Sequence, residues 1–167
     1  VSENPVWASS VTEARAELQA WQTEPAIFAK ENAPLNLWQM VQELQKQLPA
    51  DTIITNGAGN YATWAHRYFR YGGFRTQLAP TSGAMGYSVP SGVAAKIIAP
   101  ERTVVTFAGD GEFLMNGQEL ATAAQYQAGL IVCNKTVHTL KKLRVTAGTS
   151  LFMLLGGIAY AQEYPNK

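Results

Sequence analysis

Apolar positions follow two different spacings along this chain. Spacings of three and four residues predict helices over residues 11–22 and 35–48. Short runs rich in β-branched residues predict strands over residues 51–55, 76–78, 103–107 and 130–133. Further helices are expected between these strands, over residues 61–69, 86–98 (with Pro90 near the first turn) and 117–126. Repeated strand, loop and helix units predict an α/β fold of three α/β/α layers around a mainly parallel sheet.

Composition bounds the size and the class of the protein. The 167 residues are 47% hydrophobic and 15% charged, enough for one domain with a buried core. The first 34 residues are expected to be a linker that carries one short helix, and the start at Val1 rather than Met suggests a fragment. A net charge of +1, with no basic run before Lys141, argues against a nucleic-acid partner. The single Cys133 has no disulfide partner, so we expect a buried thiol in a reducing compartment.

The most informative segment is the strand that leads into Gly109, Asp110 and Gly111. It places a carboxylate between two glycines at the carboxyl end of a buried strand, where open α/β sheets bind their ligands. A carboxylate there suits a hard divalent cation, and the flanking glycines let a phosphate approach the backbone. The segment therefore predicts a site for a metal and a phosphate.

A second glycine loop, Gly57 to Ala62, follows a strand and opens a helix with the pattern G-x-G-x-x-A. This pattern is typical of dinucleotide-binding folds, which also need an acidic residue about 20 positions later for the ribose. Residues 52–100 contain no Asp or Glu. A dinucleotide-binding Rossmann-like module therefore stays an alternative, and Arg67, Arg70 and Arg75 fit either NADP binding or a solvated surface.

The third loop, Thr81 to Lys96, consists mainly of small residues that let a ligand come close to the backbone. Met85 is the one large, flexible side chain in its first part. By itself the segment is better explained by tight packing of a helix on the sheet, with Met85 filling a gap in the core.

Together, residues 56–69, 80–96 and 104–126 resemble the C-terminal cofactor domain of thiamine diphosphate-dependent enzymes, in particular the acetolactate synthase-like group. The resemblance covers residues 35–132, in the family's order and spacing. It implies the thiamine diphosphate-binding fold, truncated after a domain that spans residues 35–133.

The resemblance also implies a role for each site residue. Asp110 would bind Mg²⁺, and Gly111 and Glu112 would donate backbone hydrogen bonds to the diphosphate. Gly59, Asn60 and Tyr61 would hold the phosphates from the loop after the first strand, although the family more often has Gln-His at the last two positions. The Gly83 carbonyl would accept a hydrogen bond from the aminopyrimidine of the cofactor. Met85 would hold the cofactor in its bent form.

For the whole enzyme, the resemblance implies a cytoplasmic homodimer or homotetramer that decarboxylates a 2-oxo acid and transfers the remainder, as a lyase or transferase. The glutamate that activates the cofactor belongs to a pyrimidine-binding domain absent from this chain. We therefore assign no catalytic residue here, and Glu112 and Glu119 are poor substitutes. The alternative is a catalytically inert truncated or chimeric product.

The family's second metal ligand is an Asn at the end of the next strand. Asn134 is the only candidate here, 24 residues after Asp110. This is closer than the family spacing, and the cation of Lys135 follows directly. An amide oxygen nevertheless suits Mg²⁺, so Asn134 is kept as a candidate ligand.

Residues 134–167 form a different kind of segment, expected to be foreign or divergent. Basic residues at 141–144 precede an apolar run that ends in Ala159-Tyr160-Ala161, the order of a bacterial secretory signal peptide. The last six residues resemble the start of a periplasmic binding protein of the tricarboxylate-receptor type. A gene fusion or sequence artefact would explain the junction, and a divergent final helix is the alternative. The run is too short and glycine-interrupted for a membrane span.

Overall fold

The computed structural model describes residues 5–23, 36–135, 151–155 and 158–162. The chain divides into two compact units, residues 1–33 and residues 34–167. In the described part of the first unit, helix α1 spans Ala8–Trp21 and has no buried residue, which agrees with the helix expected over residues 11–22.

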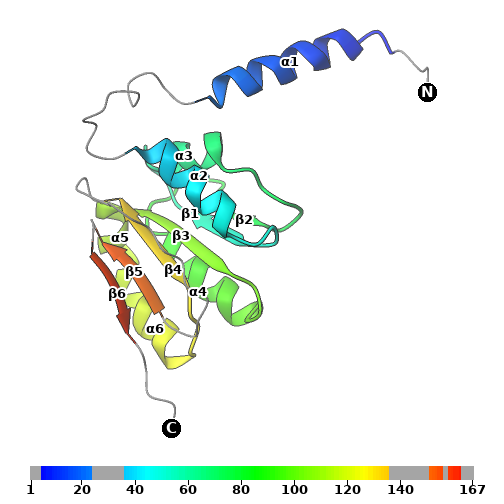
Figure 1. The fold of residues 1–167 in the computed structure, drawn as a ribbon. Coiled ribbons are helices and arrows are strands. Elements are labelled where there is room, and N and C mark those ends of the chain that lie inside the picture. Colours follow the sequence, from blue (N-terminus) through cyan, green and yellow to red (C-terminus); the bar gives the residue numbers. More distant parts are fainter. Residues whose placement is uncertain (1–4, 24–35, 136–150, 156–157, 163–167) are drawn as a thin grey trace. The chain divides into compact units, whose positions relative to one another are not determined.

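The second unit is built on one sheet with the strand order β2-β1-β3-β4-β5-β6 (Figure 1). All neighbouring pairs are parallel except β5 and β6, which are antiparallel. The mainly parallel sheet expected from the sequence is therefore confirmed. The strands are β1 (Ile53–Asn56), β2 (Gln77–Leu78), β3 (Val104–Gly109), β4 (Ile131–Lys135), β5 (Leu151–Leu155) and β6 (Ile158–Gln162).

Helices connect the strands in the expected places. They are α2 (Leu37–Gln47), α3 (Ala62–Tyr68), α4 (Ser88–Ile98), α5 (Asp110–Asn116), a 3₁₀ turn η2 (Gly117–Glu119) and α6 (Leu120–Gln125). Helix α2 begins after Asn36, whose side chain accepts a hydrogen bond from the Gln39 N–H at 3.0 Å and so caps the helix. Pro90 is the third residue of α4, within the first turn, where its missing N–H costs no helical hydrogen bond.

Side chains of the central strands alternate between two apolar clusters. Ile54, Val105 and Cys133 pack with α2 and α3, whereas the residue before each of them packs with α4 and α6. This alternation of period two covers both faces of the sheet with helices. The three α/β/α layers are therefore confirmed.

Two strands continue further than the sequence pattern indicates. Strand β3 runs to Gly109 and α5 begins at once with Asp110, so the expected Gly-Asp-Gly turn is instead a direct passage from strand to helix. Strand β4 runs to Lys135, although the apolar run that predicted it ends at Cys133. Both extensions have one cause: the register pairs Ala108 with Asn134 and Gly109 with Lys135, so the backbone hydrogen bonds of the ladder hold polar residues in the strand.

The described residues near the C-terminus form the strands β5 and β6. The alternative of a divergent final helix is therefore wrong for these residues. Strand β5 pairs with β4, and β6 pairs with β5, so the ladder rather than the helical hydrogen-bond pattern satisfies this backbone. The basic residues between positions 141 and 144 and the last five residues of the chain lie outside the described part. The signal-peptide origin of the tail stays a prediction. Within the described residues, no helix is long and apolar enough to cross a membrane.

Candidate functional site

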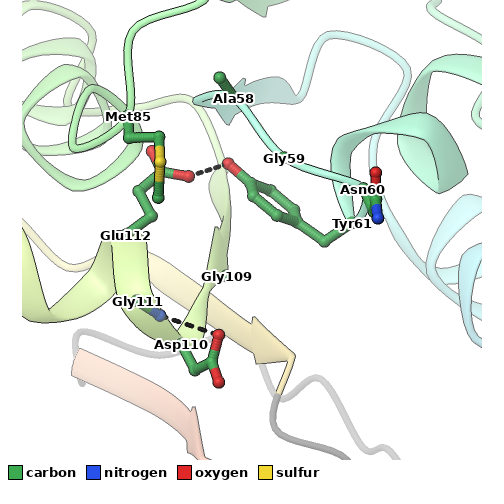
Figure 2. A pocket seen from close by; sticks show the side chains of 9 residues that line it. All are labelled: Ala58, Gly59, Asn60, Tyr61, Met85, Gly109, Asp110, Gly111 and Glu112. Atoms are coloured by element: carbon green, nitrogen blue, oxygen red, sulfur yellow. Dashed lines mark hydrogen bonds between the residues drawn. The ribbon is translucent and has the colours of Figure 1, made fainter.

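The segments after β1 and β3 meet at one edge of the sheet because the two strands are parallel neighbours and end within two residues of each other. Asn56, at the end of β1, pairs with Phe107 of β3, and each strand then leads into a glycine-bearing segment. A pocket of about 290 Å³ lies at this edge. Its lining comes from the two segments and one residue of the loop before α4: Ala58, Gly59, Asn60, Tyr61, Met85, Gly109, Asp110, Gly111 and Glu112 (Figure 2).

The pocket thus brings together seven of the eight residues expected to bind a cofactor. Gly83 is the exception, since it is exposed and does not line the pocket. Its φ of +66° places it in the left-handed region, and a Cβ there would meet nothing within 4 Å. Met85 lines the pocket with its side chain 52% exposed, so it is not the core-filling residue that the packing alternative required.

Among the residues whose burial the structure describes, Glu112 is the one buried acidic side chain, with 2% of its surface exposed. Its Oε2 accepts a short hydrogen bond from the Tyr61 hydroxyl, and its Oε1 accepts one from the Ser88 N–H at 3.2 Å. Figure 2 shows the Tyr61 and Glu112 side chains pointing toward each other. Burial of a carboxylate is costly unless its oxygens are hydrogen-bonded, and here both oxygens accept.

Tyr61 links this carboxylate to the loop after β1. Its hydroxyl accepts a hydrogen bond from the Gly57 N–H at 2.8 Å while it donates to Glu112. Burial, together with the Glu112 carboxylate, raises the pKa of Tyr61 well above its ordinary value, so the phenol stays neutral. The hydroxyl therefore faces other protein groups, and the tyrosine could contribute only its ring or backbone to a phosphate.

Asp110 differs from Glu112 in that it is exposed. It is the first residue of α5, and its Oδ1 accepts a hydrogen bond from the Gly111 N–H at 2.8 Å. A Cβ on Gly111 would meet nothing within 4 Å, so the space over this backbone is open to a ligand. An exposed carboxylate beside open backbone can accept a cation and admit an anionic group.

Asn134 belongs to β4, the parallel neighbour of the strand that leads into Asp110. It is in register with Ala108, and it is not among the residues that line the pocket. Asn134 is the last but one residue of β4, which continues to Lys135, so it lies near the carboxyl end of this strand. Its role as a metal ligand stays a prediction. The Asn134 Oδ1 is buried without a hydrogen-bond partner among the described residues, which is an unusual state for an amide oxygen.

Sequence reasoning missed three features of this site. Ala58 and Gly109 line the pocket, and the Ser88 N–H supports it through Glu112. Gly109 is the first residue of the Gly-Asp-Gly motif, but the motif does not indicate that this glycine lines the pocket. The burial of Glu112 had no signal in the sequence, since nothing in the neighbouring residues distinguishes a buried glutamate from a solvated one.

The pattern of residues 57–138 matches a family model described as "Thiamine pyrophosphate enzyme, C-terminal TPP binding domain". The match includes Gly57 to Ala62, the segment that suggested a dinucleotide site.

Similar proteins include a probable acetolactate synthase large subunit from Methanocaldococcus jannaschii, 34% identical over 66% of this chain and 18% of that protein. The chain is also similar to a sulfoacetaldehyde acetyltransferase from Castellaniella defragrans, 31% identical over 67% of this chain and 22% of that protein. This chain therefore spans only about a fifth of these relatives.

Among solved structures, the chain resembles the thiamine diphosphate-dependent 4-hydroxybenzoylformate decarboxylase of Rhodococcus jostii RHA1. The TM-score is 0.56 with 25% sequence identity, over 63% of this chain and 20% of that one. The shared fold, the family match and the acetolactate synthase relatives agree with one another. Residues 57–138 carry the C-terminal TPP-binding domain of the thiamine pyrophosphate enzymes.

Proposed function

We propose that this chain is the part of an acetolactate synthase-like enzyme that binds thiamine diphosphate (TPP) and Mg²⁺, and that the whole enzyme acts on a 2-oxo acid. The observation that carries the proposal is the convergence of Gly59, Asn60, Met85 and Asp110 on one pocket from three separate segments. The family match supports TPP as the cofactor.

The groups around the pocket fit a diphosphate with a divalent cation. Among the described residues, no three His, Cys, Asp or Glu side chains form a cage for a metal. Mg²⁺ needs no such cage, because it is commonly held by one or two carboxylates together with the phosphates of a ligand. Asp110 supplies an exposed carboxylate, and the open backbone at Gly111 leaves room for the phosphates.

Bound TPP supplies the carbanion chemistry that cleaves a 2-oxo acid, and the protein supplies binding and orientation. In this proposal Asp110 holds the cation and the Gly59–Asn60 backbone holds the diphosphate. The half-exposed side chain of Met85 gives the cofactor an apolar surface to rest on. Asn134 is a candidate second oxygen ligand, supported by its unpaired, buried Oδ1. No residue of this chain is proposed as a catalytic acid or base.

The substrate class follows from the relatives rather than from the pocket. One similar structure is a decarboxylase of 4-hydroxybenzoylformate, which is itself a 2-oxo acid, and other relatives are acetolactate synthases. We propose decarboxylation with carboligation, in a cytoplasmic homodimer or homotetramer of the full-length enzyme. The remaining domains, including the one that binds the pyrimidine, would have to complete the site.

Calorimetric titration of the full 167-residue chain with TPP, with and without Mg²⁺, tests the proposal. We expect saturable binding that requires Mg²⁺ and is lost in Asp110→Asn. Glu101→Gln is the matched control, because it removes one exposed negative charge near the opposite end of β3 and should leave binding unchanged. No binding at millimolar TPP would instead support the catalytically inert product.

A further inference from the structure

The side chain of Glu112 has a position that the expected contact of its backbone with a phosphate would not explain. Its side chain turns away from solvent and reaches two other segments: the loop after β1, through Tyr61, and the start of α4, through the Ser88 N–H. In the described part of the chain, no Lys, Arg or His forms an ion pair with it. The carboxylate is therefore held by neutral donors from two segments that meet at the pocket.

The loop after β1 is built around this carboxylate. A Cβ on Gly57 would overlap the carboxylate of Glu112. With Glu112 in this position, residue 57 therefore has to be a glycine. The Gly57 N–H donates to the Tyr61 hydroxyl, which in turn donates to Glu112. This chain of hydrogen bonds spans the loop that contributes Gly59 and Asn60 to the pocket.

The ring of Tyr61 completes the arrangement. Cβ atoms built on Gly59 and Gly109 would lie 3.1 Å and 3.0 Å from its ring carbons, so the ring occupies the space between the two glycine segments. The position of the ring depends on its hydroxyl, and the hydroxyl is fixed by Glu112. Loss of the carboxylate would leave the buried Tyr61 hydroxyl and Ser88 N–H without their acceptor.

We infer that Glu112 is a positioning residue of the cofactor pocket: its carboxylate, through Tyr61 and Ser88, holds the loop after β1 and the start of α4 in the arrangement that receives TPP. The inference rests on the proposed function and deepens it. Binding is stronger when the receiving groups are already ordered, because less conformational entropy is lost when the ligand arrives. Groups that orient direct ligands change affinity by roughly 10- to 100-fold when they are removed.

The test compares three variants of the full chain. Glu112→Gln keeps the size of the side chain but replaces one acceptor oxygen by an NH₂ group, so it cannot accept from both Tyr61 and Ser88. Tyr61→Phe removes only the hydroxyl. Glu119→Gln is the control, because Glu119 accepts a 3.0 Å hydrogen bond from Thr122 and lies outside the pocket lining.

We expect Glu112→Gln and Tyr61→Phe each to weaken Mg²⁺-dependent TPP binding by about 10- to 100-fold, with Glu119→Gln unchanged. The double variant Tyr61→Phe/Glu112→Gln should bind about as weakly as the worse single variant, because both act through one hydrogen bond. Unchanged affinity in folded Glu112→Gln, together with a lower urea midpoint, would mean a merely structural role and would overturn the inference.

A second measurement keeps the inference separate from the proposed function. Amide hydrogen exchange of Gly57 and Ser88 in the ligand-free protein should become faster in Glu112→Gln and stay unchanged in Glu119→Gln. If the wild-type chain does not bind TPP, the proposed function fails, while this exchange still tests whether Glu112 orders the two segments. Equal exchange in both variants would overturn the positioning role.

Discussion

The hydroxyls of Thr55 and Thr106 lie 2.8 Å apart across the neighbouring strands β1 and β3. The Thr55 hydroxyl also contacts the Ser88 carbonyl oxygen at 2.9 Å, so its single proton goes there and the Thr106 hydroxyl is the donor between the two threonines. Gly92 of α4 lies directly over this pair. The absence of a side chain at Gly92 is what allows α4 to approach the sheet so closely.

Gly92→Ala should therefore destabilise the protein. Its Cβ would overlap the Thr106 hydroxyl and approach Thr55, so either the helix shifts or the hydroxyl pair breaks. Overpacking of this kind costs about 1–3 kcal/mol of unfolding free energy. Urea unfolding measures the loss, and Gly73→Ala is the control, because a Cβ there meets nothing within 4 Å. Equal stability of the two variants would contradict the close packing of α4.

The core between α2 and the sheet should be sensitive to cavities. Leu44 is fully buried in the cluster that α2 and α3 form with one face of the sheet. Leu44→Ala should lower the free energy of unfolding by about 2–5 kcal/mol, through lost burial and the cavity that remains. Leu114→Ala makes the same chemical change at a side chain that is 82% exposed, and it should change stability by less than about 0.5 kcal/mol.

Stability should fall at alkaline pH. Burial raises the pKa of the Cys133 thiol from 9.0 to about 12 and that of the Tyr71 phenol from 10.0 to about 12, so the thiol acts from pH 9 and the phenol from pH 10. Between these pH values the unfolded chain ionises while the folded protein keeps its protons, so the unfolded state binds fewer protons. The stabilisation present below pH 9 is thus lost as the pH rises toward 12. The slope is up to about 1.4 kcal/mol per pH unit for each group.

Urea unfolding from pH 7 to pH 10 measures this slope. Cys133→Ala removes one titrating group, so its stability should decline less steeply above pH 9 than that of the wild type. The same burial predicts that iodoacetamide labels Cys133 only after unfolding. Parallel declines of the two proteins would show that the thiol is not the cause.

Substitutions at Gly57 and Glu112 should not be additive. Gly57→Ala alone forces its Cβ into the Glu112 carboxylate and should displace the side chain from Tyr61 and Ser88. Glu112→Ala removes the obstacle together with the hydrogen bonds. The double variant should therefore unfold at about the same urea concentration as Glu112→Ala, since the cost of Gly57→Ala disappears once the carboxylate is gone. Independent, summed losses would contradict the overlap.

Much of this architecture could be predicted from hydrophobic spacing. The strands that hold Ile54 and Val105 are β-branched runs, and α2 shows its buried face in the spacing of Val41 and Leu44. The ends of β3 and β4 could not be predicted in this way. Gly109 and Lys135 have little β-propensity, and they belong to strands because their neighbours offer ladder hydrogen bonds.

The sequence predicts which segments line the pocket, but it does not predict the hydrogen bonds between their side chains. Glycines at strand ends identified the loops that line the pocket, and Asp110 is among the lining residues. The partners of Glu112 could not be foreseen, because Tyr61 and Ser88 lie 51 and 24 residues away in sequence. Their meeting depends on the parallel register of β1 and β3 and on the course of α4, which residue types alone do not specify.

The overlap between Gly57 and Glu112 makes the residues allowed at two positions, 55 residues apart, depend on each other. A lineage that carries a small residue at the second position is free to accept a side chain at the first, whereas a lineage with the glutamate is not. Tyrosine at position 61 gains its hydrogen-bond acceptor only in the second kind of lineage. Positions 57, 61 and 112 should therefore vary together among relatives, as a substitution pattern that separates one branch of proteins with this cofactor domain from the others.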